Sequence, residues 1–234
     1  MTAADIKAKL LAKENKEKAF ELQRFFKTGE GEYAEGDLFL GITVPEQRKI
    51  VKTCLDTPIS EIELLLNEKY HECRLTALLL LVAVFQKTKT EEQKKEIVEL
   101  YLRNTKYINN WDLVDSSAHF ILGSYLANRD RSILYKLASS DLLWEQRIAI
   151  IATFHFIRNE DFADTLLISE KLLHHKHDLM HKAVGWMLRE VGNRNKAILV
   201  EFLMEYSTEM PRTMLRYAIE KFEEEERHYF LKRK

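Results

Sequence analysis

The chain has few of the residues that interrupt helices or build disulfide scaffolds, with three prolines, seven glycines and two cysteines in 234 residues. Proline and glycine are the poorest helix formers. Their scarcity, in a sequence rich in Leu, Ala, Glu and Lys, favours an almost entirely helical protein with short connections. Cys54 and Cys73 lack the spacing of metal ligands, and we expect both to be reduced thiols.

Long apolar segments are also missing. No run approaches the roughly 18–20 apolar residues that a membrane-spanning helix needs. The first 20 residues (MTAADIKAKLLAKENKEKAF) form a charged amphipathic segment, unlike a signal peptide. We therefore expect a cytoplasmic protein of bacterial type with no membrane partner. We also expect a monomer.

An excess of basic charge is absent as well. Lys and Arg number 36 against 37 Asp and Glu, which gives a net charge of −1, whereas nucleic-acid binders often carry a basic excess. Acidic residues concentrate in places such as the four Glu at 223–226, while basic residues recur at particular helical positions later in the chain. A neutral total is therefore compatible with a positive groove and an acidic back.

Several catalytic signatures are missing. The chain has no GxSxG elbow, no Gly-rich phosphate loop and no Cys–His pair with a local signature, so we expect no cofactor. His174, His175, His177 and His181 form a cluster in which the last two have the i, i+4 spacing that suits zinc. Because HExxH is absent and no third ligand is evident, we expect no metal. A metal-dependent hydrolase built on this cluster is kept as an alternative.

The hydrophobic pattern predicts helices throughout, and only residues 28–43, with four glycines, form an extended loop. The predicted helices lie near 3–27, 45–54, 58–68, 70–87, 90–104, 110–127, 130–138, 141–157, 161–173, 177–192, 195–206 and 211–231, the last with a break near Phe222.

From residue 58 the helices form pairs, and the second helix of each pair follows a weak template. A bulky residue is followed three positions later by one that is often Arg, and two positions after that by a small one. The small positions are Thr76, Ser116, Ala149, Gly185 and Ala218, spaced 40, 33, 36 and 33 residues apart. Helix pairs with this period are typical of an α-solenoid of HEAT or armadillo type.

We therefore predict an all-α fold, an α-solenoid of HEAT-like helical pairs with a concave face. Residues 1–234 would form a single domain, in which 1–57 are capping helices and a loop and 58–234 are the repeats.

The segment NNWDLVDSS (109–117) is the most informative stretch of the chain. Asn110 is a good N-cap for the helix that follows. Trp111 and Asp115 are four residues apart, so a helix places the aromatic ring and the carboxylate on one face. A carboxylate beside an aromatic face is a natural receptor for a cation. The alternative reading is a buried, satisfied Asp beside a core Trp.

Basic residues recur on the second helices of later pairs. Lys182, Trp186 and Arg189 form one helical stripe, and basic residues beside an exposed Trp suit a sugar-phosphate backbone. Arg147 suits either a phosphate clamp or an inter-repeat salt bridge. In a solenoid, one groove would receive side chains from consecutive repeats, namely Trp111, Asp115, Arg147, Trp186 and Arg216.

Five segments of the chain resemble the AlkD-like DNA alkylation repair family, which are HEAT-repeat DNA glycosylases. They are RFFKTGEGEYAEGDLFLGITVPEQR (24–48), NNWDLVD (109–115), LWEQRIAI (143–150), HKAVGWMLREVG (181–192) and PRTMLRYAIEK (211–221). Some members carry an aromatic pair just upstream of the fourth segment, where this chain has Asp178, Leu179 and Met180.

This resemblance implies cleavage of the N-glycosidic bond of cationic alkylated purines, of the 3-methyladenine and 7-methylguanine types, without a metal or cofactor. It implies that Asp115 is the catalytic carboxylate, that Trp111 and Trp186 contact the lesion deoxyribose, and that Arg147 contacts DNA. The family is associated with leaving the lesion stacked. The partner would be double-stranded DNA that contains alkylated bases. A non-enzymatic HEAT-repeat scaffold that binds DNA or a protein is the alternative.

Overall fold

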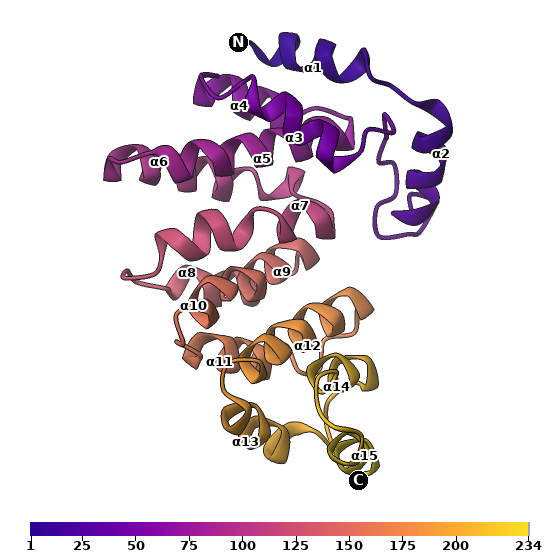
Figure 1. Ribbon diagram of the computed structural model, residues 1–234, viewed down its shortest axis with the longest axis vertical. Helices are drawn as coiled ribbons and strands as arrows, with labels where there is room; N and C mark the ends of the chain where they lie inside the picture. Colours follow the sequence, from indigo (N-terminus) through magenta and orange to yellow (C-terminus); the bar gives the residue numbers. More distant parts are fainter. Residues whose placement is uncertain (234) are drawn as a thin grey trace. The chain divides into compact units, whose positions relative to one another are not determined.

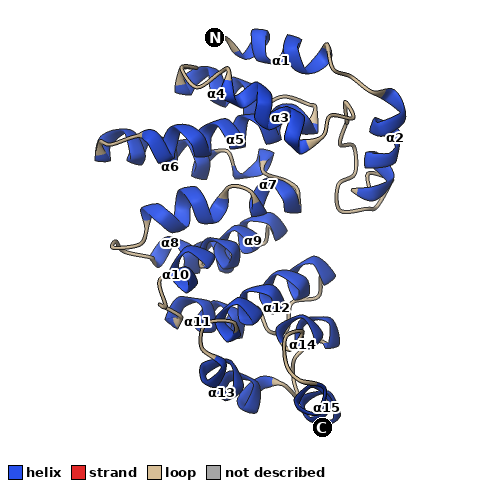
Figure 2. Cartoon of the chain, viewed as in Figure 1, coloured by secondary structure: helices blue, strands red, loops and turns tan. Residues whose placement is uncertain are grey.

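The computed structural model describes residues 1–233, and within them the regular structure is helical (Figures 1 and 2). The only strand-like feature among these residues is an isolated parallel bridge between Leu38 and Tyr70. The predicted all-α fold is confirmed. Within residues 1–233 no helix is both long enough and apolar enough to cross a membrane.

The chain divides into two compact units, Met1–Ser117 and Ala118–Lys234. The helices of the first unit are α1 (Ala3–Leu11), α2 (Lys16–Phe25), α3 (Val44–Lys52), α4 (Ile59–Leu66), α5 (His71–Lys87), α6 (Glu91–Arg103), the 3-10 turn η1 (Thr105–Tyr107) and α7 (Trp111–Asp115). That the whole chain forms one domain with a continuous concave face stays a prediction.

Helix α5 is the core of the first unit. Every side chain from His71 to Val82 is buried, as expected for a helix that neighbours cover on all sides. Helices α1, α3, α4, α6 and α7 all pack against it. The start of α5 therefore provides a rigid base for anything bonded to it.

The second unit contains a π-helical turn, η2 (His119–Gly123), and the α-helices α8 to α15. Their bounds are α8 (Ser132–Ala138), α9 (Leu143–Ala152), α10 (Phe154–Arg158), α11 (Ala163–Lys171), α12 (Asp178–Gly192), α13 (Lys196–Tyr206), α14 (Arg212–Ala218) and α15 (Glu224–Lys232). Helix α12 is central, with α9, α11, α13 and α14 around it.

Gly185 explains how closely α12 and α14 approach. A Cβ atom at this position would lie 2.5 Å from the carbonyl oxygen of Met214 and 2.6 Å from Cβ of Tyr217. Only glycine fits so near another backbone. The small-residue position predicted from the repeat is therefore a point of close helix packing in this pair.

Three helices that were predicted to be continuous are interrupted. Residues 3–27 form two helices, because Asn15 starts α2 by accepting a hydrogen bond from the amide of Lys18 at 2.9 Å. The helix predicted over 141–157 breaks at Thr153, whose hydroxyl donates to the carbonyl of Ile150 at 2.7 Å. Such local bonds compete with the helical ladder. The break predicted near Phe222 is confirmed between α14 and α15.

The helix predicted over 110–127 is also discontinuous. Helix α7 ends at Asp115, and the hydroxyls of Ser116 and Ser117 donate back to the carbonyls of Asp112 and Leu113, each at 2.6 Å. In the second unit the π-helical turn follows. A Cβ atom on Gly123, at its end, would lie 2.2 Å from the carbonyl oxygen of Ala152.

Candidate functional site

Helix α7 carries two of the predicted site residues and is only five residues long. Its predicted start is confirmed, since Asn110 accepts a hydrogen bond from the amide of Trp111 at 2.8 Å. Because the helix runs from Trp111 to Asp115, their side chains emerge from the same face. Both are half-buried. An isolated helix this short is unstable in water, so contacts with the rest of the unit determine its position.

A buried ion network supplies one of these contacts. His71, at the start of α5, lies between two carboxylates: its Nδ1 is 3.1 Å from Oδ2 of Asp37, and its Nε2 is 2.8 Å from Oδ2 of Asp112. Arg74, one turn along α5, bonds the other oxygen of Asp37 through Nη2. The His71 side chain is 2% exposed. The network therefore joins α7, α5 and the loop before α3.

The carboxylates hold His71 in its protonated form. Burial by itself lowers the pKa of His71, but Asp112 and Asp37 outweigh it and raise this pKa to about 9. Burial likewise raises the pKa of Asp37, whereas bonds to His71 and Arg74 lower it by more, so that pKa lies below its ordinary value. At neutral pH two cations and two carboxylates therefore balance.

This network predicts a pH dependence of stability. The pKa of His71 is higher in the folded than in the unfolded chain, so its contribution, about 3 kcal/mol, is complete below pH 6.5 and disappears as the pH rises through about 9. In urea titrations the free energy of unfolding should fall between pH 7 and 10 by about 2–3 kcal/mol more for the wild type than for His71→Gln. Equal losses in the two proteins would mean that His71 is not the group responsible.

An aromatic stack provides the second support of α7. The rings of Trp111 and Phe26 stack with centroids 5.2 Å apart and planes 17° apart, and Phe26 stacks on Phe39 at 5.0 Å. Phe39 in turn stacks on the His71 ring at 4.5 Å. One face of Trp111 is therefore core, which is the alternative reading of this residue, although the side chain keeps part of its surface in solvent.

The surroundings of Asp115 are partly polar. Tyr101 is fully buried, and its hydroxyl lies 3.0 Å from Oγ of Ser117. Burial is the main cause that raises the pKa of Tyr101, and the charge of Asp115 adds to the rise. The charge of Asp115 therefore acts on the Tyr101 hydroxyl. A carboxylate beside an aromatic ring, on a helix held by the ion network and the aromatic stack, can stabilise a positive charge placed against that face.

A cavity of about 240 Å³ lies beside the network within the first unit. Aromatic rings and apolar side chains form most of its wall, and His71 and Asp112 contribute polar groups. It is lined by Lys18, Leu22, Phe25, Phe26, Phe39, Ile42, Thr43, Val44, Gln47, His71, Glu72, Leu75 and Asp112.

In the second unit Trp186 is half-buried on α12. Its Nε1 donates to Oε1 of Glu190 at 3.3 Å, and its ring centroid is 5.8 Å from that of Phe154. Two guanidinium groups lie over the Phe154 ring, that of Arg158 at 4.4 Å and that of Arg194 at 5.8 Å from its centroid. Trp186 therefore stands in an aromatic and cationic setting, of which the sequence indicated only Trp186.

The predicted DNA-binding residues occupy different environments. Arg147 is 5% exposed, and its Nη1 donates to the carbonyl of Leu179 at 2.7 Å, which ties α9 to the start of α12. Lys182 pairs with Asp178 at 2.7 Å, and Arg189 pairs with Glu220. Arg216 is exposed on α14. Arg216 is thus the most accessible of the four, and their contacts with DNA stay a prediction.

The histidine cluster is bonded within the protein. His175 Nε2 lies 2.8 Å from Oε1 of Gln146, and His181 Nε2 bonds the carbonyl of His175. His177 Nδ1 accepts from the amide of Leu179 at 3.1 Å and so caps α12. Among residues 1–233 no group of three possible His, Cys, Asp or Glu ligands comes together. In this structure His177 of the cluster caps α12, and His175 and His181 make other bonds within the second unit.

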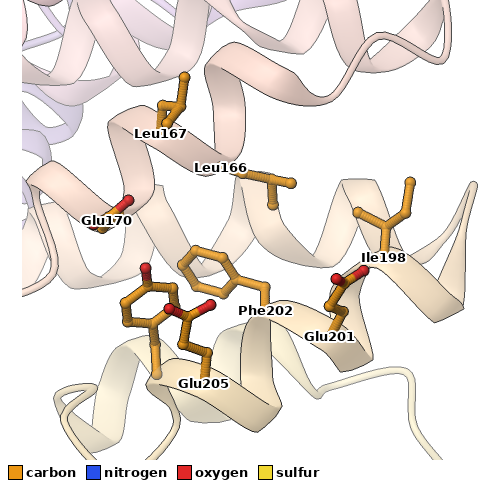
Figure 3. Close-up of a pocket in the computed structure, with 8 residues that line it drawn as sticks. Leu166, Leu167, Glu170, Ile198, Glu201, Phe202 and Glu205 are labelled. Carbon is orange, nitrogen blue, oxygen red and sulfur yellow. The ribbon is translucent and has the colours of Figure 1, made fainter.

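An acidic groove of about 260 Å³ lies between α11 and α13 of the second unit (Figure 3). Leu166 and Phe202 face each other in it, and three carboxylates, Glu170, Glu201 and Glu205, stand around them. Carboxylates repel phosphates, so this groove is unsuited to DNA.

Comparisons with known proteins found a matching family model and a similar solved structure. Residues 6–222 match the family model described as DNA alkylation repair enzyme. A solved structure, a predicted DNA alkylation repair enzyme from Enterococcus faecalis, is similar with a TM-score of 0.69 and 19% identity over 90% of this chain and 97% of that one. A search of the curated proteins found no match. The family match covers nearly the whole chain, and the protein therefore belongs to the DNA alkylation repair enzymes and has a role in DNA repair.

Proposed function

We propose that the protein is a DNA glycosylase that releases cationic N3- and N7-alkylated purines from duplex DNA by hydrolysing the N-glycosidic bond, without a metal or cofactor. The observation that carries this proposal is the shared face of Trp111 and Asp115 on α7, a helix fixed by a buried ion network and an aromatic stack.

The chemistry follows from the charge of the lesion. Alkylation at N3 or N7 makes the purine cationic, so the electron pair of the C1′–N bond leaves with a base that becomes neutral. Positive charge then develops on the deoxyribose as an oxocarbenium ion. The Asp115 carboxylate and the Trp111 ring stabilise this cation. Water adds to C1′, and Asp115 orients it and accepts its proton.

This mechanism needs no extrusion of the base into a deep pocket. The reacting atom is on the sugar, and both Trp111 and Asp115 are half-buried on the surface of a helix. We therefore propose that the lesion reacts without full base flipping, unlike the substrates of most glycosylases. Trp186 on α12 is proposed as a second aromatic contact with the lesion deoxyribose.

Basic residues of the second unit are proposed to hold the phosphates, namely Arg147, Lys182, Arg189 and Arg216. Two variants separate structure from binding. Arg216→Ala should lower the slope of log K against log salt by about 0.9 with unchanged unfolding, because an exposed cation costs little stability when removed. Arg147→Ala should lower this slope by a similar amount. It should also lower the free energy of unfolding by about 1.5–3 kcal/mol, since the charged hydrogen bond of Arg147 is buried. An unchanged slope for Arg147→Ala would assign this residue to structure alone.

The function is tested on an end-labelled duplex with a single 7-methylguanine. After incubation with excess protein, a diamine that breaks strands at abasic sites should cut at the lesion. The unmodified duplex serves as the matched control and should stay intact. Tight binding of both duplexes with no cut would favour the alternative, a non-enzymatic scaffold that binds DNA.

A further inference from the structure

The position of α7 depends on few contacts within the first unit. Trp111 stacks on Phe26, Asp112 bonds His71, and Ser117 just beyond the helix bonds Tyr101. The bond to His71 is an ion pair. It is made by the residue that follows Trp111 and stands three positions before Asp115, so a change in it moves the proposed reactive face directly.

His71 is a firm anchor because it is bonded on both sides. It stands at the first position of α5, the buried core helix, and its Nδ1 donates to Asp37. Asp37 is held in turn by Arg74 of the same helix. The neighbouring Glu72 accepts amide bonds from Leu40, Gly41 and Ile42 at 2.9, 2.8 and 3.2 Å, which fixes the loop that carries Asp37.

The charges around His71 make this anchor depend on its proton. Asp37 and Asp112 contact the ring, Arg74 neutralises one of them, and Glu72 is occupied by the loop amides. Lys18 also lines the cavity that adjoins the ring. Loss of the proton from His71 would leave the Asp112 carboxylate without its cation, although Asp112 is only 16% exposed. A buried charge without a partner is costly, so α7 would shift to hydrate it.

We propose that His71 and Asp112 are positioning residues for base release, and that the protonated His71 ring locks α7 so that Trp111 and Asp115 meet the lesion sugar in a fixed geometry. This inference rests on the proposed function. It deepens that proposal by naming a group that controls the site without touching the substrate. A displacement of about 1 Å at a catalytic group costs on the order of 100-fold in rate.

The first test measures single-turnover release of 7-methylguanine with saturating protein. His71→Gln and Asp112→Asn should each lower the rate about 10–100-fold, with duplex affinity within about twofold of the wild type. The double variant should be no slower than either single one, because both remove the same bond. Asp112→Glu keeps the charge and should recover part of the rate.

A matched control is Glu63→Gln, which breaks another ion pair of the first unit, the one between Glu63 and Arg103. Its rate should stay within about twofold of the wild type. The rate of the wild type should also fall above pH 9, where His71 loses its proton. This fall should be missing from the pH–rate profile of His71→Gln. Rates of His71→Gln and Asp112→Asn equal to the control would overturn the inference.

A second readout does not need activity. In a Trp144→Phe/Trp186→Phe background Trp111 is the sole tryptophan, because the chain has three. Its emission should shift with a midpoint near pH 9 while circular dichroism shows a folded protein, and His71→Gln should abolish the shift. A shift in this background, together with no base release by the wild type, would reject the proposed function but keep the lock. A flat emission between pH 7 and 10 would reject the lock.

Discussion

Asp115→Asn should lower the single-turnover rate of base release by about 10²–10³-fold, which corresponds to about 3–4 kcal/mol of barrier. The substitution keeps the shape of the side chain on α7 but removes the negative charge that is proposed to stabilise the developing sugar cation. Duplex affinity should change by less than about twofold, because the proposed phosphate contacts are made by basic residues elsewhere. The measurement is the release of 7-methylguanine with protein in excess.

The matched control for this variant is Asp56→Asn. Asp56 is an exposed carboxylate of the same unit, so the control removes the same charge from the unit at a different position. It should leave the rate unchanged. If Asp115→Asn released the base at a near-normal rate, the catalytic role of this carboxylate would be wrong.

The sequence predicted the parts of the fold that depend on local patterns. The absence of strands from residues 1–233, the extended loop over 28–43 and the break near Phe222 all follow from helix propensity and glycine placement. The errors arise where one side chain competes with the helical ladder. Asn15 and Thr153 each make a local bond that ends a run of otherwise continuous helical pattern.

The candidate site was predictable only where it is local. Trp111 and Asp115 share a helical turn, so their spacing was enough to place them on one face. The ion network joins positions 37, 71 and 112, and no periodicity relates residues so far apart in the chain. His71 and Arg74 stand five and two positions before Thr76, where the repeat template has a bulky residue and an Arg. This match to the template hid their charge pairing. The only local signal was the second acid, Asp112, within the NNWDLVD motif.

The ion pairing and burial of the predicted basic residues could not be predicted from the sequence either. The sequence places Lys182 and Arg189 on one stripe of α12, but Glu220, the partner of Arg189, comes from beyond α14. The burial of Arg147 follows from the packing of α9 against α12, which a helical pattern alone does not specify. Charge pairing between distant elements requires the tertiary structure.

Lesion selectivity should be large and should follow the leaving ability of the base. Cationic N3- and N7-alkylated purines depart as neutral bases, whereas uracil and hypoxanthine would depart as anions. A site that stabilises only the sugar cation gives the neutral lesions no help, and it has no hydrogen-bond readout of a base edge to select them. We therefore expect release from a 7-methylguanine duplex to exceed release from a uracil duplex by at least about 10³-fold, which is roughly 4 kcal/mol of barrier.

This comparison uses two duplexes of identical sequence that differ at the lesion alone, under single-turnover conditions with protein in excess. An unmodified duplex sets the background. Efficient release of uracil would mean that the protein activates a neutral leaving group, and the mechanism based on the sugar cation would be wrong.

The most direct measurement follows the modified base itself. Duplex DNA methylated at purine nitrogens is incubated with the protein, the polymer is precipitated, and both fractions are analysed by chromatography and mass spectrometry. The proposed glycosylase predicts free 7-methylguanine and 3-methyladenine in the supernatant, with an equal number of abasic sites in the polymer. Loss of the methyl group with guanine and adenine retained in the DNA, or modified bases that all stay in the polymer, would contradict it.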